Sequence, residues 1–192
     1  MRSIGIWQQR YRDSGNSGLG SRGDLLQFKV DFINSFIEEN NIETVLDFGH
    51  GDLEVANGLV VSDYTGIDIF ESNVSHESHI KLVNSRFDEY DGDSVDLVLC
   101  LDVLYHILED EEEYLCKTID KLIEKANKFV VIYAQDSLNL YFDHQYKEHL
   151  HNSKWIQYIQ KAHSDNLTLI HRQDEPTSGS SALFFVYKKN KV

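Results

Sequence analysis

The sequence predicts an α/β fold in which helices cover both faces of a mostly parallel β-sheet of seven strands. Two observations carry this prediction: apolar segments of strand length alternate with segments of helical periodicity, and the most apolar segment lies near the middle of the chain. The chain has 192 residues, 41% of them hydrophobic and 26% charged, which suits one globular domain with a proper core.

The first 23 residues differ in composition from the rest. They are rich in Gly, Ser and Arg, and Trp7 and Tyr11 are embedded among them. A disordered tail rarely carries a tryptophan, so we expect residues 1–23 to form a loop with aromatic anchors. The core, residues 24–192, then begins with a helix that Asp24 caps. The apolar stripe of this helix recurs at helical spacing, at Leu26, Val30, Ile33 and Ile37.

Alternating strands and helices follow the first helix. The predicted strands cover 44–48, 64–69, 79–84, 94–104 and 128–134, with a short helix at 52–60 and a longer one at 110–127. The most apolar strand, 94–104, is expected at the centre of the sheet, buried on both faces. The acidic run EDEEEY, 109–114, follows this strand in the sequence and is expected to begin a helix, where carboxylates suit the positive end of the helix dipole, rather than to bind a metal ion.

The last part of the chain predicts one more helix and a pair of strands. The helix covers 153–164, and the strands 167–173 and 181–189 are joined by a turn-forming stretch. This strand pair indicates one antiparallel edge strand. Three histidines precede the helix, but their spacing matches no helical face with three ligands, so we expect no metal at His144, His149 and His151.

The charge and composition of the chain limit the classes of partner that it can bind. The net charge is −14, and duplex nucleic acid needs a basic face, so a nucleic-acid partner is disfavoured. No apolar run approaches the ~20 residues that span a bilayer, and the N-terminus lacks the apolar core of a signal peptide. Cys100 and Cys116 have no metal spacing and are expected to be reduced thiols. We therefore expect a cytoplasmic protein without a membrane span; the sequence predicts no oligomeric state.

A glycine turn follows the first strand, in the stretch TVLDFGHGDLE. Gly49 and Gly51 let the backbone approach a ligand closely, and Asp68, 19 residues after Gly49, ends the second strand, where an acid binds a ribose diol. Two features disfavour a dinucleotide: Glu54 replaces the third glycine, and Asp47 would repel a pyrophosphate. A ligand with a ribose, a cationic centre and no phosphate fits better, and S-adenosylmethionine (SAM) has these properties.

Three motifs then resemble a known family. VLDFGHG, GIDI and VDLVLCLDVLYHI resemble the glycine-turn, ribose-acid and post-fourth-strand motifs of class I SAM-dependent methyltransferases. The N-terminal W-x-x-R-Y and SG-x-GS-x-G segments further resemble small bacterial and phage methyltransferases found among glycan-biosynthesis genes. The resemblance implies a three-layer Rossmann-like methyltransferase sandwich with SAM as cofactor.

The resemblance implies a role for each of several residues in this sequence. It implies that the methionine end of the cofactor contacts Asp47, Gly49 and Gly51, that Asp68 binds the ribose, and that Ile69 packs on the adenine. The remaining implied positions are Leu101 and Asp102 for the cofactor, and Tyr105 and His106 for the transfer site. Leu53 departs from the family pattern, because it replaces a small residue in the turn.

Several of these residues allow two interpretations. His50 is either an exposed loop residue or a cofactor contact, and His106 is either the general base for a substrate hydroxyl or a structural residue. Tyr133, near the end of the fifth strand, is expected to contact the substrate and is the next candidate base, with His144. Trp7 and Tyr11 are hydrophobic anchors or parts of a lid that contacts the cofactor.

The expected activity is O-methylation of a small molecule or glycan. Methyl transfer depends mainly on alignment of the nucleophile with the methyl group, so the sequence indicates the cofactor more strongly than the substrate. The alternatives are methylation of protein or RNA, which the acidic charge disfavours, and a non-catalytic domain that binds the cofactor or a partner.

Overall fold

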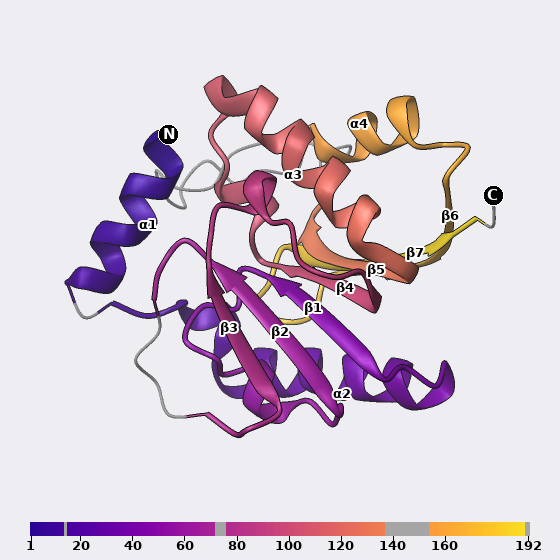
Figure 1. Cartoon of the computed structure of the whole chain (residues 1–192), viewed down its shortest axis with the longest axis horizontal. Coiled ribbons are helices and arrows are strands. Elements are labelled where there is room, and N and C mark those ends of the chain that lie inside the picture. Colours follow the sequence, from indigo (N-terminus) through magenta and orange to yellow (C-terminus); the bar gives the residue numbers. More distant parts are fainter. Residues whose placement is uncertain (14, 72–75, 137–153, 191–192) are drawn as a thin grey trace.

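The computed structural model has the topology of a parallel α/β sheet with one reversed strand. It describes residues 1–13, 15–71, 76–136 and 154–190. Seven strands form one sheet in the order β3-β2-β1-β4-β5-β7-β6 (Figure 1). Their bounds are β1 Thr44–Phe48, β2 Asp63–Asp68, β3 Ile80–Asn84, β4 Val95–Leu101, β5 Ala126–Gln135, β6 Leu167–Arg172 and β7 Ala182–Lys189. This confirms the predicted fold class.

The reversed strand is β7, which pairs antiparallel with β5 on one side and with β6 on the other. The other pairs are parallel. The antiparallel strand therefore lies one position in from the edge, and β6 is the edge strand. β4 takes the central position that its apolar sequence predicts, with every residue buried except the half-buried Asp96.

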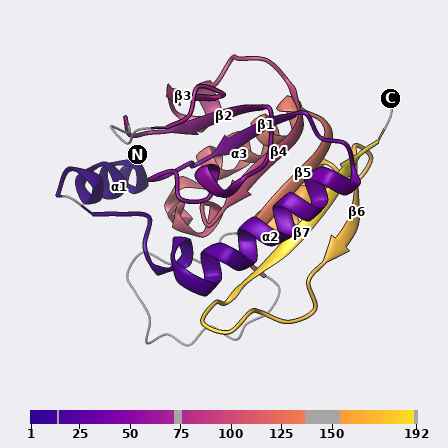
Figure 2. The same cartoon turned by 90° about the horizontal axis from the view of Figure 1, so that it is seen from below.

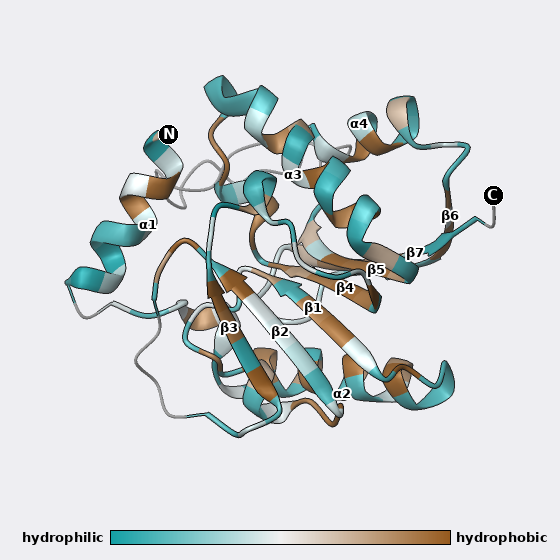
Figure 3. Cartoon of the chain, in the orientation of Figure 1, coloured by the Kyte–Doolittle hydropathy of each residue, from teal (hydrophilic) through white to brown (hydrophobic). Residues whose placement is uncertain are grey.

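Helices cover both faces of the sheet. Helix α2, Gly23–Glu39, lies on one face of the sheet, in front of the strands in Figure 2, while α3, Glu112–Lys125, and α4, Trp155–Ala162, lie on the other face, at the top of Figure 1. Along α3, hydrophobic and hydrophilic residues alternate as expected for a helix with one buried side (Figure 3).

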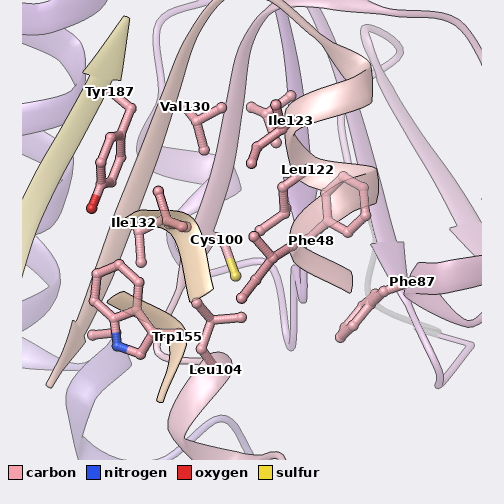
Figure 4. Packing of buried hydrophobic residues seen from close by; sticks show 14 of the residues in the cluster. Phe48, Phe87, Cys100, Leu104, Leu122, Ile123, Val130, Ile132, Trp155 and Tyr187 are labelled. Atoms are coloured by element: carbon pink, nitrogen blue, oxygen red, sulfur yellow. The ribbon is translucent and has the colours of Figure 1, made fainter. Parts of the chain in front are cut away.

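Strand side chains alternate between the two cores. In β4, Val98 and Cys100 point to the α3 side, whereas Leu97, Leu99 and Leu101 point to the α2 side. On the α3 side, Trp155 of α4 and Leu122 of α3 pack with residues of the central strands (Figure 4). The two cores hold the C-terminal ends of β1, β2 and β4 at one edge, where a site can form.

The N-terminal segment is helical, which corrects the expected loop. Helix α1 spans Arg2–Arg12, and its N-terminal amides, those of Arg2 and Ser3, donate to the carboxylate of Glu111. Arg10 and Arg12 lie in its last turn, where cations suit the helix dipole. The Gly- and Ser-rich composition belongs to the residues after the helix.

Two further local predictions were wrong. Asp24 does not cap α2, because the helix begins at Gly23 and Asp24 lies in its first turn. The helix expected at 52–60 is reduced to one 3₁₀ turn, Ala56–Gly58. Leu53 explains the difference, because its left-handed backbone, with φ of 68°, prevents a helix from starting directly after the glycine turn.

Candidate functional site

The glycine turn joins β1 to the segment that leads to β2. Gly49 and Gly51 have φ values of 94° and 57°, in the region that favours glycine. A Cβ atom at Gly49 would lie 2.4 Å from Val103 Cγ2, and one at Gly51 would lie 2.2 Å from Ser17 Oγ. Both glycines are therefore required by their neighbours as well as by their backbone conformation.

Asp68, the last residue of β2, holds this turn in place through a hydrogen bond. The backbone N–H of Gly51 donates to Asp68 Oδ2 at 2.9 Å. The carboxyl group is buried, and burial raises its pKa to about 6, although hydrogen bonds from the N–H groups of Gly51, Ile69 and Phe70 act in the opposite direction. A carboxylate held by backbone donors is well placed to accept a ribose diol.

Asp47 is buried at the end of β1 with an unused oxygen. The Tyr64 hydroxyl donates to Asp47 Oδ2 at 2.7 Å, whereas Asp47 Oδ1 has no hydrogen-bond partner among the described residues. Burial raises the pKa of Asp47 and outweighs the hydrogen bond from Tyr64. A buried, unpaired carboxylate oxygen is costly, and a cationic group next to it would remove that cost.

His50 is buried, so the interpretation as an exposed loop residue was wrong. Its ring packs over Gly66, where a Cβ atom would lie 2.9 Å from the imidazole, and its Nδ1 lies 2.9 Å from the carbonyl oxygen of Gly51. Burial lowers the pKa of the imidazole. His50 therefore helps to fix the shape of the turn.

An ion pair between a buried lysine and a partly buried aspartate lies just beyond β4. Asp102 has a left-handed backbone with φ of 59°, and its Oδ2 lies 2.6 Å from Lys29 Nζ of α2. The Tyr105 hydroxyl donates to Asp102 Oδ1 at 2.7 Å. Tyr105 thus orients Asp102 and does not line the pocket. Burial raises the pKa of the Tyr105 hydroxyl, and the negative charge of Asp102 adds to this effect.

Tyr133 also lies outside the pocket lining, although it was expected to contact the substrate. Its side chain is buried within the sheet, and its hydroxyl donates to Ser180 Oγ at 2.8 Å. The centroid of the Tyr133 ring lies 5.6 Å from Lys29 Nζ, and so the ring supports the buried ammonium group.

The N-terminal segment packs over the edge of the sheet that carries the turn. Tyr11 stacks on Phe70 with ring centroids 4.4 Å apart, and Gln8 Nε2 donates to the Ile69 carbonyl at 3.0 Å. Trp7 packs edge-on against His106, with ring centroids 4.6 Å apart. The segment therefore contacts the chain after β2 and after β4.

Asp52 links the same segment to the glycine turn. Ser17 Oγ donates to Asp52 Oδ1 at 2.8 Å, and the Arg22 guanidinium donates to the same carboxylate. These hydrogen bonds hold the pKa of Asp52 below its usual range, against the effect of burial. Glu54, in the place of a third glycine, lies 3.7 Å from Arg22.

Most of the sequence-predicted site residues line one pocket at this edge. They are Trp7, Tyr11, Asp47, Gly49, His50, Gly51, Asp68, Ile69, Leu101, Asp102 and His106. Sequence reasoning missed Lys29, Asp52, Ser17 and Val103, which line or frame the same pocket. A lysine within the apolar stripe of α2, four residues before Ile33, was the one available signal for Lys29.

Within the described ranges, no group of His, Cys, Asp or Glu side chains is arranged to hold a metal ion. The three histidines weighed as ligands, His144, His149 and His151, lie outside those ranges. Each helix that the structure describes is too short or too polar to cross a bilayer. Cys100 and Cys116 are free thiols.

Solved structures similar to this chain include several methyltransferases. Magnesium protoporphyrin IX methyltransferase from Synechocystis PCC 6803 with bound SAM has a TM-score of 0.70 and 15% identity, covering 99% of this chain and 98% of that one. The N-methyltransferase NodS from Bradyrhizobium japonicum WM9, in complex with S-adenosylhomocysteine (SAH), has a TM-score of 0.70 and 15% identity over 96% and 98%. The methyltransferase domain of bacterial CtHen1 has a TM-score of 0.66 and 17% identity over 86% and 98%.

No family model and no curated protein matches the sequence. At these identities the likeness defines the fold, which is that of class I SAM-dependent methyltransferases.

Proposed function

We propose that this protein is a SAM-dependent methyltransferase. The observation that carries the proposal is the arrangement of Asp47, the glycine turn and Asp68 at the C-terminal ends of β1 and β2, in one pocket. The unpaired Oδ1 of Asp47 suits the ammonium group of SAM, and Asp68 suits the ribose diol. The left-handed Gly49 and Gly51 let the backbone approach the ligand.

The charge of the pocket disfavours phosphate-bearing cofactors such as NAD and ATP. Five carboxyl groups line it, those of Asp47, Asp52, Glu54, Asp68 and Asp102, whereas Lys29 is the one lysine or arginine among the described lining residues. A pyrophosphate would be repelled by this arrangement, but a ligand with a sulfonium and an ammonium would be attracted.

The chemistry asks little of the protein beyond alignment and exclusion of water. SAM supplies a methyl group already activated by the sulfonium. Trp7 and His106 pack against each other and both line the pocket, so an acceptor hydroxyl that lies in the pocket next to His106 would have the imidazole as its general base. We assign His106 this role, with Trp7 as the side chain that limits access of water.

The N-terminal segment, residues 1–23, is proposed as a lid over the cofactor. Three attachments hold it: Tyr11 on Phe70, Gln8 on the Ile69 carbonyl, and Ser17 on Asp52. Of α1 itself only Ser3 is buried, so the helix adds little to the core. A segment with few attachments and little buried surface needs less free energy to open than the rest of the domain does.

For the acceptor, we favour the hydroxyl of a small molecule or glycan. The net charge of −14 and the acidic pocket disfavour RNA, although a solved structure of the same fold is described as small RNA methyltransferase HEN1. Methylation of protein or RNA is therefore the second candidate activity, and a non-catalytic cofactor-binding domain is the third.

Two measurements test the proposal. Calorimetry with SAM, SAH, NAD and ATP should detect binding of the first two alone. SAH formation should then be followed with a panel of sugars and small alcohols, and with RNA and protein as competing acceptors. Tight NAD binding without any response to SAH would refute the cofactor, whereas cofactor binding without turnover on any acceptor would favour the non-catalytic domain.

A further inference from the structure

Lys29 is a buried cation in the wall of the pocket. Its side chain is 1% exposed, and its Nζ lies 2.6 Å from Asp102 Oδ2. Asp102 is its one hydrogen-bond partner within the described part of the chain, and an ammonium group has three donors, so two remain for a ligand. Burial of an ammonium with unused donors is costly, which indicates a purpose beyond packing.

Asp102 is held firmly in place for this pairing. Its carboxylate receives the Tyr105 hydroxyl as well as Lys29, and its own backbone N–H donates to the Tyr133 carbonyl at 2.8 Å. Its left-handed backbone, at φ of 59°, is uncommon for a residue with a side chain. A strained backbone and a buried charge therefore coincide at one point of the pocket wall.

The position of Lys29 relative to the glycine turn defines what it can bind. Lys29 and Asp47 line the same pocket, and Asp47 Oδ1 has no partner among the described residues. Burial raises the pKa of Asp47, and the positive charge of Lys29 acts in the opposite direction. A cation thus lies near two carboxyl groups, those of Asp47 and Asp102, in a pocket that is otherwise acidic. An α-amino acid group, with its ammonium and carboxylate on one carbon, complements this set of charges.

We propose that Lys29 binds the α-carboxylate at the amino-acid end of the cofactor, while Asp102 and Tyr105 position Lys29 for this contact. The inference rests on the proposed function and extends it, because it makes the carboxylate a condition for tight binding. The protein then distinguishes adenosyl ligands that carry an amino-acid group from those that lack one.

The experiment compares three ligands and four forms of the full chain. The ligands are SAH, its decarboxylated analogue, in which a hydrogen replaces the α-carboxylate, and 5′-methylthioadenosine, which lacks the whole amino-acid end. Calorimetry measures each with wild type, Lys29→Met and Lys29→Gln, the second keeping a donor for Asp102. Lys128→Met is the matched control, since Lys128 pairs with Asp96 at 3.1 Å at the opposite end of β5 from Tyr133.

Wild type should bind SAH about 10- to 100-fold more tightly than the decarboxylated analogue, the usual effect of a hydrogen bond to a charged group. Both Lys29 variants should bind these two ligands about equally and keep wild-type affinity for methylthioadenosine. Lys128→Met should behave as wild type.

Three results would overturn the inference while leaving the proposed function in place. They are equal binding of SAH and its decarboxylated analogue by wild type, full discrimination by a folded Lys29 variant, or an equal loss of affinity for all three ligands in that variant. Failure of wild type to bind any of the three would instead refute the proposed function, and the inference with it.

Discussion

Acidification should weaken cofactor binding through Asp68. Burial raises the pKa of this carboxyl group to about 6, although three backbone N–H groups stabilise its ionised form. A ribose diol donates its hydrogen bonds, so it binds the carboxylate and competes with the proton. Affinity should therefore fall as the pH falls through the pKa.

The expected loss follows directly from this pKa. With a pKa of about 6, roughly nine tenths of Asp68 is ionised at pH 7 and about one tenth at pH 5. If the cofactor binds the ionised form alone, its affinity falls about tenfold between these two values. Asp47, whose pKa is also raised by burial, changes affinity in the same direction through the ammonium group.

The stability of the ligand-free protein should change in the opposite direction. Because the folded-state pKa of Asp68 lies above the ordinary 3.8, the folded protein binds the proton more tightly than the unfolded chain does. The resulting stabilisation is fully present below about pH 3.8 and is lost as the pH rises through about 6. Its full size is on the order of 3 kcal/mol.

Calorimetry with SAH at pH 5, 6 and 7 checks the first trend, since SAH itself keeps its charge over this range. Thermal unfolding without ligand checks the second, with Asp68→Asn as the comparison. The variant should bind SAH weakly and with a smaller pH dependence, and it should be more stable than wild type at pH 7 by a margin that narrows toward pH 4. A wild-type affinity that stays constant from pH 5 to 7 would refute the assignment of Asp68 to the ribose.

Three other changes test the lid, the base and the turn. Deletion of residues 1–22 should leave a folded domain with reduced affinity for SAH, because α1 buries only Ser3; circular dichroism and calorimetry measure both, and an unfolded product would make the segment structural. His106→Ala should lower turnover by about 10²–10⁴-fold at nearly unchanged SAH affinity, and a variant with full turnover would exclude it as the base. Leu53→Ala should lower the free energy of unfolding by about 2–5 kcal/mol in urea denaturation, because this side chain is fully buried; wild-type stability would contradict its place in the core.

The strands of the sheet were predicted from periodicity, but the N-terminal helix was not. Ser3, Trp7 and Tyr11 recur at helical spacing, yet the glycines and serines that follow them dominate the composition of the segment. The N-terminus of α1 is stabilised by Glu111, whose carboxylate accepts a hydrogen bond from the backbone N–H of Arg2, 109 positions away in the sequence. Local propensity contains no information about such a partner.

Site residues at strand ends were easier to predict than residues within strands. Gly49 and Gly51 follow β1, and Asp68 is the last residue of the adjacent parallel strand β2, so all three lie at the edge where the C-terminal ends of these strands meet. Tyr133 was assigned to the same edge, but β5 continues to Gln135, so its side chain points into the α2 core against Phe184. The predicted strand ended at 134, one residue before the observed end, so Tyr133 lay within the strand in the prediction as well, and a side chain within a central strand points into one of the two cores.

Lys29 shows why a buried charge is difficult to recognise from a pattern alone. A lysine beside an apolar stripe usually extends its ammonium group into water, and the sequence of α2 is compatible with that arrangement. Only the fold brings Asp102, 73 residues later, within 2.6 Å of it. Because an unpaired ammonium at 1% exposure would cost several kcal/mol, Lys29 and Asp102 must be considered as one unit. The loop after β4 therefore determines the charge of the pocket wall jointly with a helix that precedes β1.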